Sequence, residues 1–132
     1  MVYVNQKMII QRSALDSILL TNVVDLRFAR RTPKPGFPAT RRILCTKSLN
    51  LLNSTNGRIT LNYKIPKGPH KVNEAADNLL VVWDILMQDY RNISMNQAIL
   101  LSQYPADDSF WTYFNDNIYP MSAEQKLAFM NS

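Results

Sequence analysis

Basic side chains that can bind phosphate gather in the first half of this 132-residue chain. Residues 1–72 hold thirteen of the fifteen Lys and Arg residues and two of the ten acidic ones, a formal charge of +11, whereas residues 73–132 have a formal charge of −6. A basic surface concentrates polyanions around it, and an acidic surface repels them. We therefore expect the first half to contact DNA or RNA.

The candidate nucleic-acid contacts lie on predicted strands or beside two predicted loops: Arg27, Arg30, Arg31, Lys34, Arg41, Arg42, Lys64, Lys67 and Lys71. Phe37 and Tyr63 lie among them, and proteins that bind single strands combine basic grooves with aromatic rings that stack on bases. The sequence has no helix-turn-helix, zinc-finger or RNP signature, so we expect contacts dominated by phosphate, with weak sequence preference. The alternative is that each basic residue belongs to a solvated surface, and that either ring fills the end of a barrel.

A second candidate surface is aromatic and lies near the end of the chain. Residues 110–119 hold five aromatic side chains, too many for all of them to fit inside one small barrel. Trp111, Tyr113 and Phe114 are the candidates for a protein-docking surface, because aromatic anchors dominate the binding energy of many interfaces. The competing interpretation is that this segment is a helix that covers the core with the same rings.

Residues suited to catalysis are not assembled in this sequence. His70, the one histidine, lies between Pro69 and Lys71 without a zinc-ligand or nucleophile partner at a recognisable spacing. The three glycines are scattered and form no phosphate-binding loop. Cys45, the one cysteine, excludes an intramolecular disulfide. We therefore expect a protein that is not an enzyme and that uses no cofactor or metal.

Four strands are predicted to position these residues. Two-residue alternation predicts strands at residues 23–29 and 40–47, joined by a loop at residues 31–38 that holds three prolines and a glycine. Val24, Leu26 and Phe28 of the first strand and Ile43 and Cys45 of the second should face inward. The apolar run at residues 79–86 predicts a buried strand, which forms a hairpin with residues 89–95 through a turn at Met87 and Gln88.

The remaining segments are predicted to be less regular or helical. Residues 58–65 alternate and predict a further strand after a turn at Asn56 and Gly57. Apolar spacing between Met8 and Leu19 predicts an N-terminal helix, and residues 97–103 are read as helical. Helix starts are expected near Asp107 and Asp108 and at Ser122, where Ser122 and Gln125 have the spacing of a capping box.

These strand sequences resemble a known family. The motifs are Val24-Asp-Leu-Arg-Phe28, Thr40-Arg-Arg-Ile-Leu-Cys-Thr46, Val82-Trp-Asp-Ile85 and Asp89-Tyr-Arg-Asn-Ile93. In order and spacing they are similar to the small phage-encoded Sm-like, SH3-type β-barrel proteins (WYL-related), over Asn22 to Ile99. The proline-rich loop and the long insertion from Leu49 to Lys71 depart from that pattern. The resemblance implies a fold and a phage origin, whereas related barrels bind RNA, DNA or proteins, so fold alone does not decide function.

We accordingly predict an α+β protein, a small antiparallel Sm-like/SH3-type β-barrel with an N-terminal helix and a helical C-terminal extension. One domain is expected, with a barrel core at residues 22–99 and an appendage at residues 100–132. The predicted function is that of a non-catalytic phage accessory protein that binds nucleic acid and modulates transcription or nucleic-acid handling, in the cytoplasm of the infected host. The alternative is a protein-interaction module, either an inhibitor of a host enzyme or a small virion component. No apolar run is long enough to span a membrane.

Overall fold

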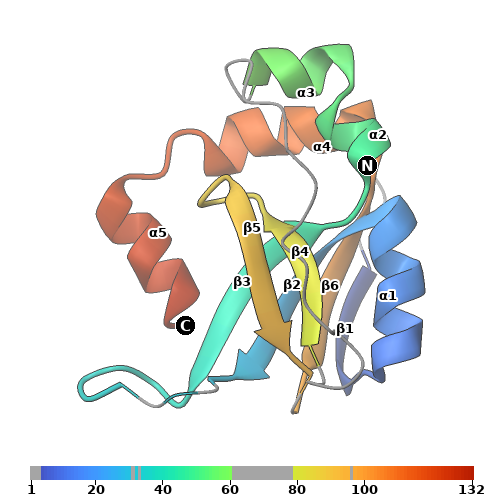
Figure 1. The fold of residues 1–132 in the computed structure, drawn as a ribbon. Coiled ribbons are helices and arrows are strands. Elements are labelled where there is room, and N and C mark those ends of the chain that lie inside the picture. The colour runs from blue at the N-terminus through green and yellow to red at the C-terminus, as the bar shows by residue number, and fades with distance from the viewer. Residues whose placement is uncertain (1–3, 31, 33, 61–78, 96) are drawn as a thin grey trace.

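The computed structural model describes residues 4–30, 32, 34–60, 79–95 and 97–132. Over these residues the protein has an α+β fold, in which one antiparallel sheet is accompanied by several helices (Figure 1). The sheet has six strands in the order β1-β6-β2-β3-β4-β5, and every neighbouring pair is antiparallel. The strands are β1 (Val4–Ile9), β2 (Asn22–Ala29), β3 (Thr40–Thr46), β4 (Leu79–Asp84), β5 (Asp89–Ser94) and β6 (Ile99–Pro105).

The β2–β3 hairpin is the longest pairing and follows the predicted alternation. Its register places Val24 opposite Cys45 and Leu26 opposite Ile43. These side chains are buried together in one hydrophobic cluster, so the predicted inward face is confirmed. Leu44, which points to the other face, is buried in a second cluster. Both faces of this part of the sheet are therefore covered.

The predicted hairpin of the second half is also confirmed, with β4 and β5 paired from Leu79 with Ser94 to Asp84 with Asp89. All six residues of β4 are buried. The link between the two hairpins is narrow, because β3 pairs with β4 only at Cys45 with Asp84 and at Thr46 with Trp83. Leu80, Val82 and Ile93 nevertheless share the first cluster with β2 and β3. The sheet thus bends so that its two hairpins enclose one core.

The predicted closed barrel is not seen. The edge strands β1 and β5 do not pair with each other over the described residues, so the sheet is open. The helix predicted at residues 97–103 is also wrong. Residues 99–103 belong to strand β6, which lies between β1 and β2 and buries Leu100, Ser102 and Tyr104 on alternate positions. Because β6 is an interior strand, the boundary drawn between a core ending at residue 99 and an appendage starting at residue 100 is wrong.

The N-terminal helix begins later than predicted. Met8 and Ile9 belong to β1, and α1 (Arg12–Thr21) starts after Gln11 and buries Leu15 and Leu19 in the first cluster. The two C-terminal helix starts are confirmed. Asp107 caps α4 (Asp108–Tyr113), which continues into the π-helix η1 (Phe114–Ile118), and Ser122 forms a capping box with Gln125 at α5 (Ala123–Met130).

The predicted strand at residues 58–65 is not found where the structure describes it. Short helices α2 (Leu49–Leu52) and α3 (Thr55–Thr60) occupy this region, and residues 61–65 lie outside the described residues. Gly57 lies in α3 against the end of α2, where an added Cβ would come within 2.6 Å of the carbonyl oxygens of Leu51 and Leu52. Close approach of two helices, and not a hairpin turn, is what this glycine permits.

The second cluster joins the middle of the chain to its C-terminal helices. It combines Leu51 and Leu52 of α2, Trp83 of β4 and the aromatic side chains of α4 and η1. Figure 1 shows α2, α3 and α4 grouped there, whereas α1 lies on another part of the sheet, against β2 and β3. Within the described residues no helix has the length and apolar character needed to cross a membrane.

Candidate nucleic-acid interface

The loop between β2 and β3 projects from the body of the protein (Figure 1). Its base is closed by the amide of Arg30, which donates to the carbonyl of Ala39 at 2.9 Å. Its tip is a turn in which the amide of Phe37 donates to the carbonyl of Lys34 at 3.1 Å and Gly36 has a φ of 81°. Glycine adopts this left-handed conformation at little cost. The turn therefore fixes Lys34 and Phe37 at the end of the hairpin.

An aromatic ring and two cations meet at this tip. The side chain of Phe37 is 46% exposed. The guanidinium of Arg30 lies 5.5 Å from the centre of its ring, and its Nε donates to the carbonyl of Pro38 at 3.0 Å. Lys34 is exposed beside them. A ring held by a cation and open to solvent on a protruding loop is suited to stacking on a base.

Two of the predicted contact residues are instead counter-ions of buried carboxylates. Arg42 holds Asp25 through two bonds, Nε to Oδ1 at 2.8 Å and Nη2 to Oδ2 at 2.6 Å. Arg41 Nη2 lies 3.0 Å from Oδ2 of Asp84. Asp25 is 5% exposed and Asp84 1% exposed, and a buried carboxylate needs such a partner. Both arginines therefore have a structural role, whatever else they contact.

The electrostatics of the two arginines differ. Burial lowers the pKa of Arg41, although Asp84 opposes the shift. The hydrogen bonds to Asp25 raise the pKa of Arg42, because that pair is bidentate and more exposed to solvent. The charge of Arg42 is thus firmly fixed beside a carboxylate, and its outer edge remains available to a second acceptor.

The last residues of the chain supply such acceptors. Arg42 Nη1 donates to Oγ of Ser132 at 3.1 Å, Arg27 Nε donates to the main-chain oxygen of Ser132 at 3.3 Å, and Arg30 Nη2 donates to Oδ1 of Asn131 at 2.8 Å. The guanidinium of Arg42 also lies 4.2 Å from the centre of the Phe129 ring. Nothing in the sequence pattern connects Phe129, Asn131 and Ser132 with these arginines, which precede them by about ninety to a hundred positions.

The structure brings together five of the predicted basic residues on the β2–β3 hairpin: Arg27, Arg30, Lys34, Arg41 and Arg42. Arg31, Lys64, Lys67 and Lys71, together with the aromatic residue Tyr63, lie outside the described residues. Within the described residues, no group of three His, Cys, Asp or Glu side chains is placed to hold a metal ion.

The predicted aromatic docking surface is corrected by the structure. Trp111 is 2% exposed and Phe114 3% exposed, and both pack in the second cluster. Trp111 also donates from Nε1 to Oγ of Ser54 at 3.2 Å. Tyr113 is half-buried and stacks on Tyr104 with ring centres 4.8 Å apart. These rings cover the end of the sheet, which was the competing interpretation, because α2 and β4 supply the apolar surface that they bury.

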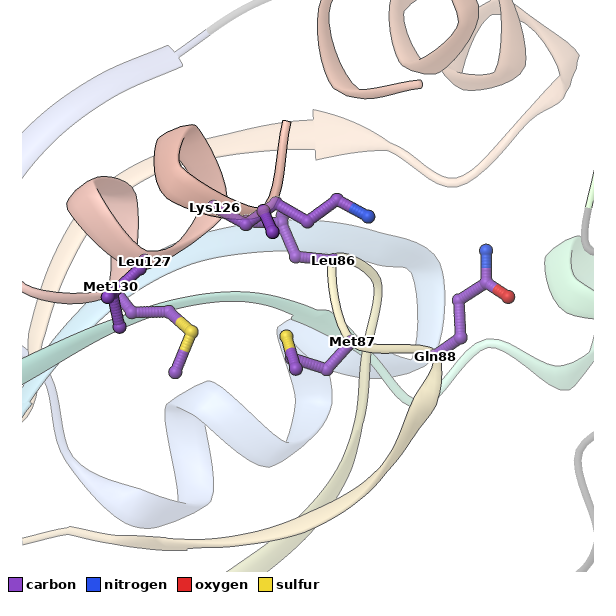
Figure 2. Close-up of a pocket in the computed structure, with 7 residues that line it drawn as sticks. Leu86, Met87, Gln88, Lys126, Leu127 and Met130 are labelled. Atoms are coloured by element: carbon purple, nitrogen blue, oxygen red, sulfur yellow. The ribbon is translucent and has the colours of Figure 1, made fainter. Parts of the chain in front are cut away.

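A groove that the sequence did not indicate lies between α5 and the β4–β5 turn. Its volume is about 630 Å³, and its lining is mostly apolar: Leu86, Met87, Gln88, Ala123, Lys126, Leu127 and Met130. Figure 2 shows the side chains of Met87 and Met130 directed toward each other across it. Because the lining comes from two segments about forty residues apart, no local sequence pattern predicts the groove.

Comparison of the chain with models of known protein families, with curated proteins and with solved structures finds no match. Function is therefore inferred from the residues of the β2–β3 hairpin and their surroundings.

Proposed function

We propose that this protein binds single-stranded nucleic acid, DNA or RNA, through the β2–β3 hairpin and without catalysis. The observation that carries the proposal is the tip of the hairpin, where exposed Phe37 lies beneath Arg30 and next to Lys34. Base stacking on an aromatic ring tolerates every base, and neighbouring cations attract the backbone phosphates. The protein accordingly binds nucleic acids of different sequence with little preference among them.

The biological setting is proposed from the family resemblance. The resembling motifs occupy β2, β3, β4 and β5, and they pair as two antiparallel hairpins around one core. This supports a relation to Sm-like, SH3-type barrels of phage origin, in an opened form. The proposed role is that of an accessory protein that modulates transcription or nucleic-acid handling in the cytoplasm of an infected bacterial host.

A protein-interaction module, either an inhibitor of a host enzyme or a virion component, is the second candidate. The observation that favours it is the groove beside α5, where Met87 is 42% exposed and Leu127 50% exposed. Methionine side chains adapt to varied apolar partners. This groove replaces Trp111, Tyr113 and Phe114 as the surface for that function.

The test is fluorescence anisotropy with labelled single strands of mixed sequence, DNA and RNA, at about 50 mM salt. Phe37→Ala should weaken binding by about 1–3 kcal/mol, because a stacked base loses its platform. Lys34→Gln should weaken it by a smaller amount through loss of one phosphate contact.

Two matched variants control for loss of any exposed ring or charge. Tyr119 is 72% exposed outside the hairpin, and Arg58 is exposed on α3. Tyr119→Ala and Arg58→Gln should bind as the wild type does. If the wild type binds neither strand at low salt, or if the hairpin variants bind unchanged, the proposal fails and the interaction module remains.

A further inference from the structure

Three arginine side chains from two strands converge on the last two residues of the chain. Arg27 of β2, Arg30 at the end of β2 and Arg42 of β3 donate to the main-chain oxygen of Ser132, Oδ1 of Asn131 and Oγ of Ser132, at 3.3, 2.8 and 3.1 Å. Figure 1 shows the end of α5 lying beside β3. Three guanidinium groups are thus arranged around one compact set of oxygen atoms.

Two of the acceptors in this set are neutral, although all three donors are charged. The amide oxygen of Asn131 accepts from Arg30 and the hydroxyl of Ser132 accepts from Arg42. Asp25 is the one Asp or Glu side chain that pairs with these three arginines among the described residues. A phosphate group adds Coulomb attraction to such hydrogen bonds, and the planar guanidinium geometry suits its oxygens. A phosphate is therefore a stronger acceptor for Arg30 and Arg42 than these neutral oxygens.

The element that occupies the position has no buried residue. Phe129, which contacts Arg42, is partly buried and packs against the edge of the second cluster. The groove of about 630 Å³ separates much of the helix from the β4–β5 turn. The first hydrophobic cluster contains no residue of α5. The last turn can consequently leave the arginines without opening the first cluster and without exposing a buried side chain of α5.

We infer that Arg27, Arg30 and Arg42 form a site for a backbone phosphate of nucleic acid, which the last turn of α5 occupies in the free protein. Binding then displaces Asn131 and Ser132. This inference rests on the proposed function and specifies its regulation, since Arg30 belongs both to this site and to the stacking platform at Phe37. The strand would run from the ring at the hairpin tip toward β3.

The experiment uses two full-length variants with opposite expected effects on affinity for a labelled single-stranded oligonucleotide. The triple variant Phe129→Ala, Asn131→Ala and Ser132→Ala removes the ring contact and two of the three acceptors. Its affinity should rise by about fivefold or more, because a larger fraction of molecules has the site free. Asn131→Asp places a carboxylate at the acceptor of Arg30 and should lower the affinity about fivefold.

Each variant has a matched control. Leu127→Ala truncates an exposed apolar side chain of the same helix, and Asn115→Asp adds the same charge on the exposed surface of η1. Both should bind within about twofold of the wild type, because neither changes the occupant of the site. Hydrogen exchange verifies the intended change, with faster exchange in residues 123–130 of the triple variant and unchanged protection in β2 and β3.

The outcomes separate the inference from the proposed function. A rise for the triple variant together with a fall for Asn131→Asp supports displacement. The inference is overturned if the triple variant, with rapid exchange in α5, binds no more tightly than the wild type. It is also overturned if Asn115→Asp lowers the affinity as much as Asn131→Asp does. In either case the proposed function still stands if Phe37→Ala reduces binding. Absence of binding by the wild type and by the triple variant at low salt defeats both.

Discussion

The side chain of Asp84 ends β4 and uses both of its oxygens inside the protein. Oδ2 accepts from Arg41, and Oδ1 accepts from the amide of Met87 at 3.1 Å, which fixes the β4–β5 turn. Burial raises its pKa above the ordinary value of 3.8, and the opposing effects of the Met87 amide and Arg41 do not cancel this shift. The ionised carboxylate is therefore tolerated in the folded protein at a cost.

A pH dependence follows for the variant Asp84→Asn. A carboxyl with a raised folded-state pKa binds its proton more tightly in the folded chain, so its contribution to the free energy of unfolding is greatest below pH 3.8 and declines as pH rises through the folded pKa. The variant should be about as stable as the wild type at low pH, because its amide replaces a carboxyl that is protonated and neutral there. As pH rises, the wild type should lose stability relative to the variant, because its carboxyl then has to ionise in a buried position.

Urea unfolding of both proteins across the acidic range measures this difference directly. Because the other titrating groups are shared, their contributions cancel in the comparison. A wild-type free energy of unfolding that stays constant or rises relative to that of the variant as pH rises would show that the Asp84 pKa is not raised by folding.

Helices α4 and η1 cover the second cluster. Phe110, Trp111, Phe114 and Ile118 are all buried there. We predict that truncation after Pro105 exposes Leu44, Leu51 and Leu52 and leaves a chain that unfolds or aggregates, because each large buried side chain that is removed costs about 2–5 kcal/mol. Binding of a hydrophobic dye, sedimentation and circular dichroism report the outcome.

A shorter truncation is the matched control. A chain ending after Met121 keeps α4 and η1 and loses only α5, none of whose residues is buried. It should stay folded, with a cooperative thermal transition. A soluble, cooperatively folded product of truncation after Pro105 would mean that the aromatic residues do not belong to the core.

Across the whole molecule, the charges of the first half are only partly compensated. Its two acidic residues, Asp16 and Asp25, pair with Lys47 and Arg42. Among the described residues, Arg27, Arg30 and Lys34 pair with no Asp or Glu side chain, and they lie on one hairpin of a chain with a formal charge of +5. This excess is available to an external polyanion.

We predict that the logarithm of the oligonucleotide affinity falls with the logarithm of the salt concentration with a slope of about −2, since each phosphate contact on a single strand contributes about −0.7 and three cations make such contacts. Anisotropy titrations between about 50 and 300 mM salt give the slope. A slope near zero would point to association through apolar contacts, such as those of the groove beside α5, and not through phosphate.

Elements whose signals are local could be predicted from the residues alone. Alternation placed β2, β3 and β5 and the inward side of Ile43 and Cys45, because side chains of a strand point to opposite faces in turn. A continuous apolar run placed β4, which is buried throughout. Asp107 and Ser122 marked helix starts, because a capping side chain bonds an amide only two or three residues away. The charged hairpin was likewise evident from residue types alone.

Which of these residues the fold uses depends on contacts between segments that are far apart in the sequence. Residues 99–105 form a short apolar segment that suits a helix or a strand, and pairing with both β1 and β2 selects the strand. Burial of Trp111 and the pairing of Arg41 and Arg42 with Asp84 and Asp25 join positions 17 to 57 residues apart. Contacts over such separations depend on how the sheet bends and on what covers it, and these are properties of the whole chain.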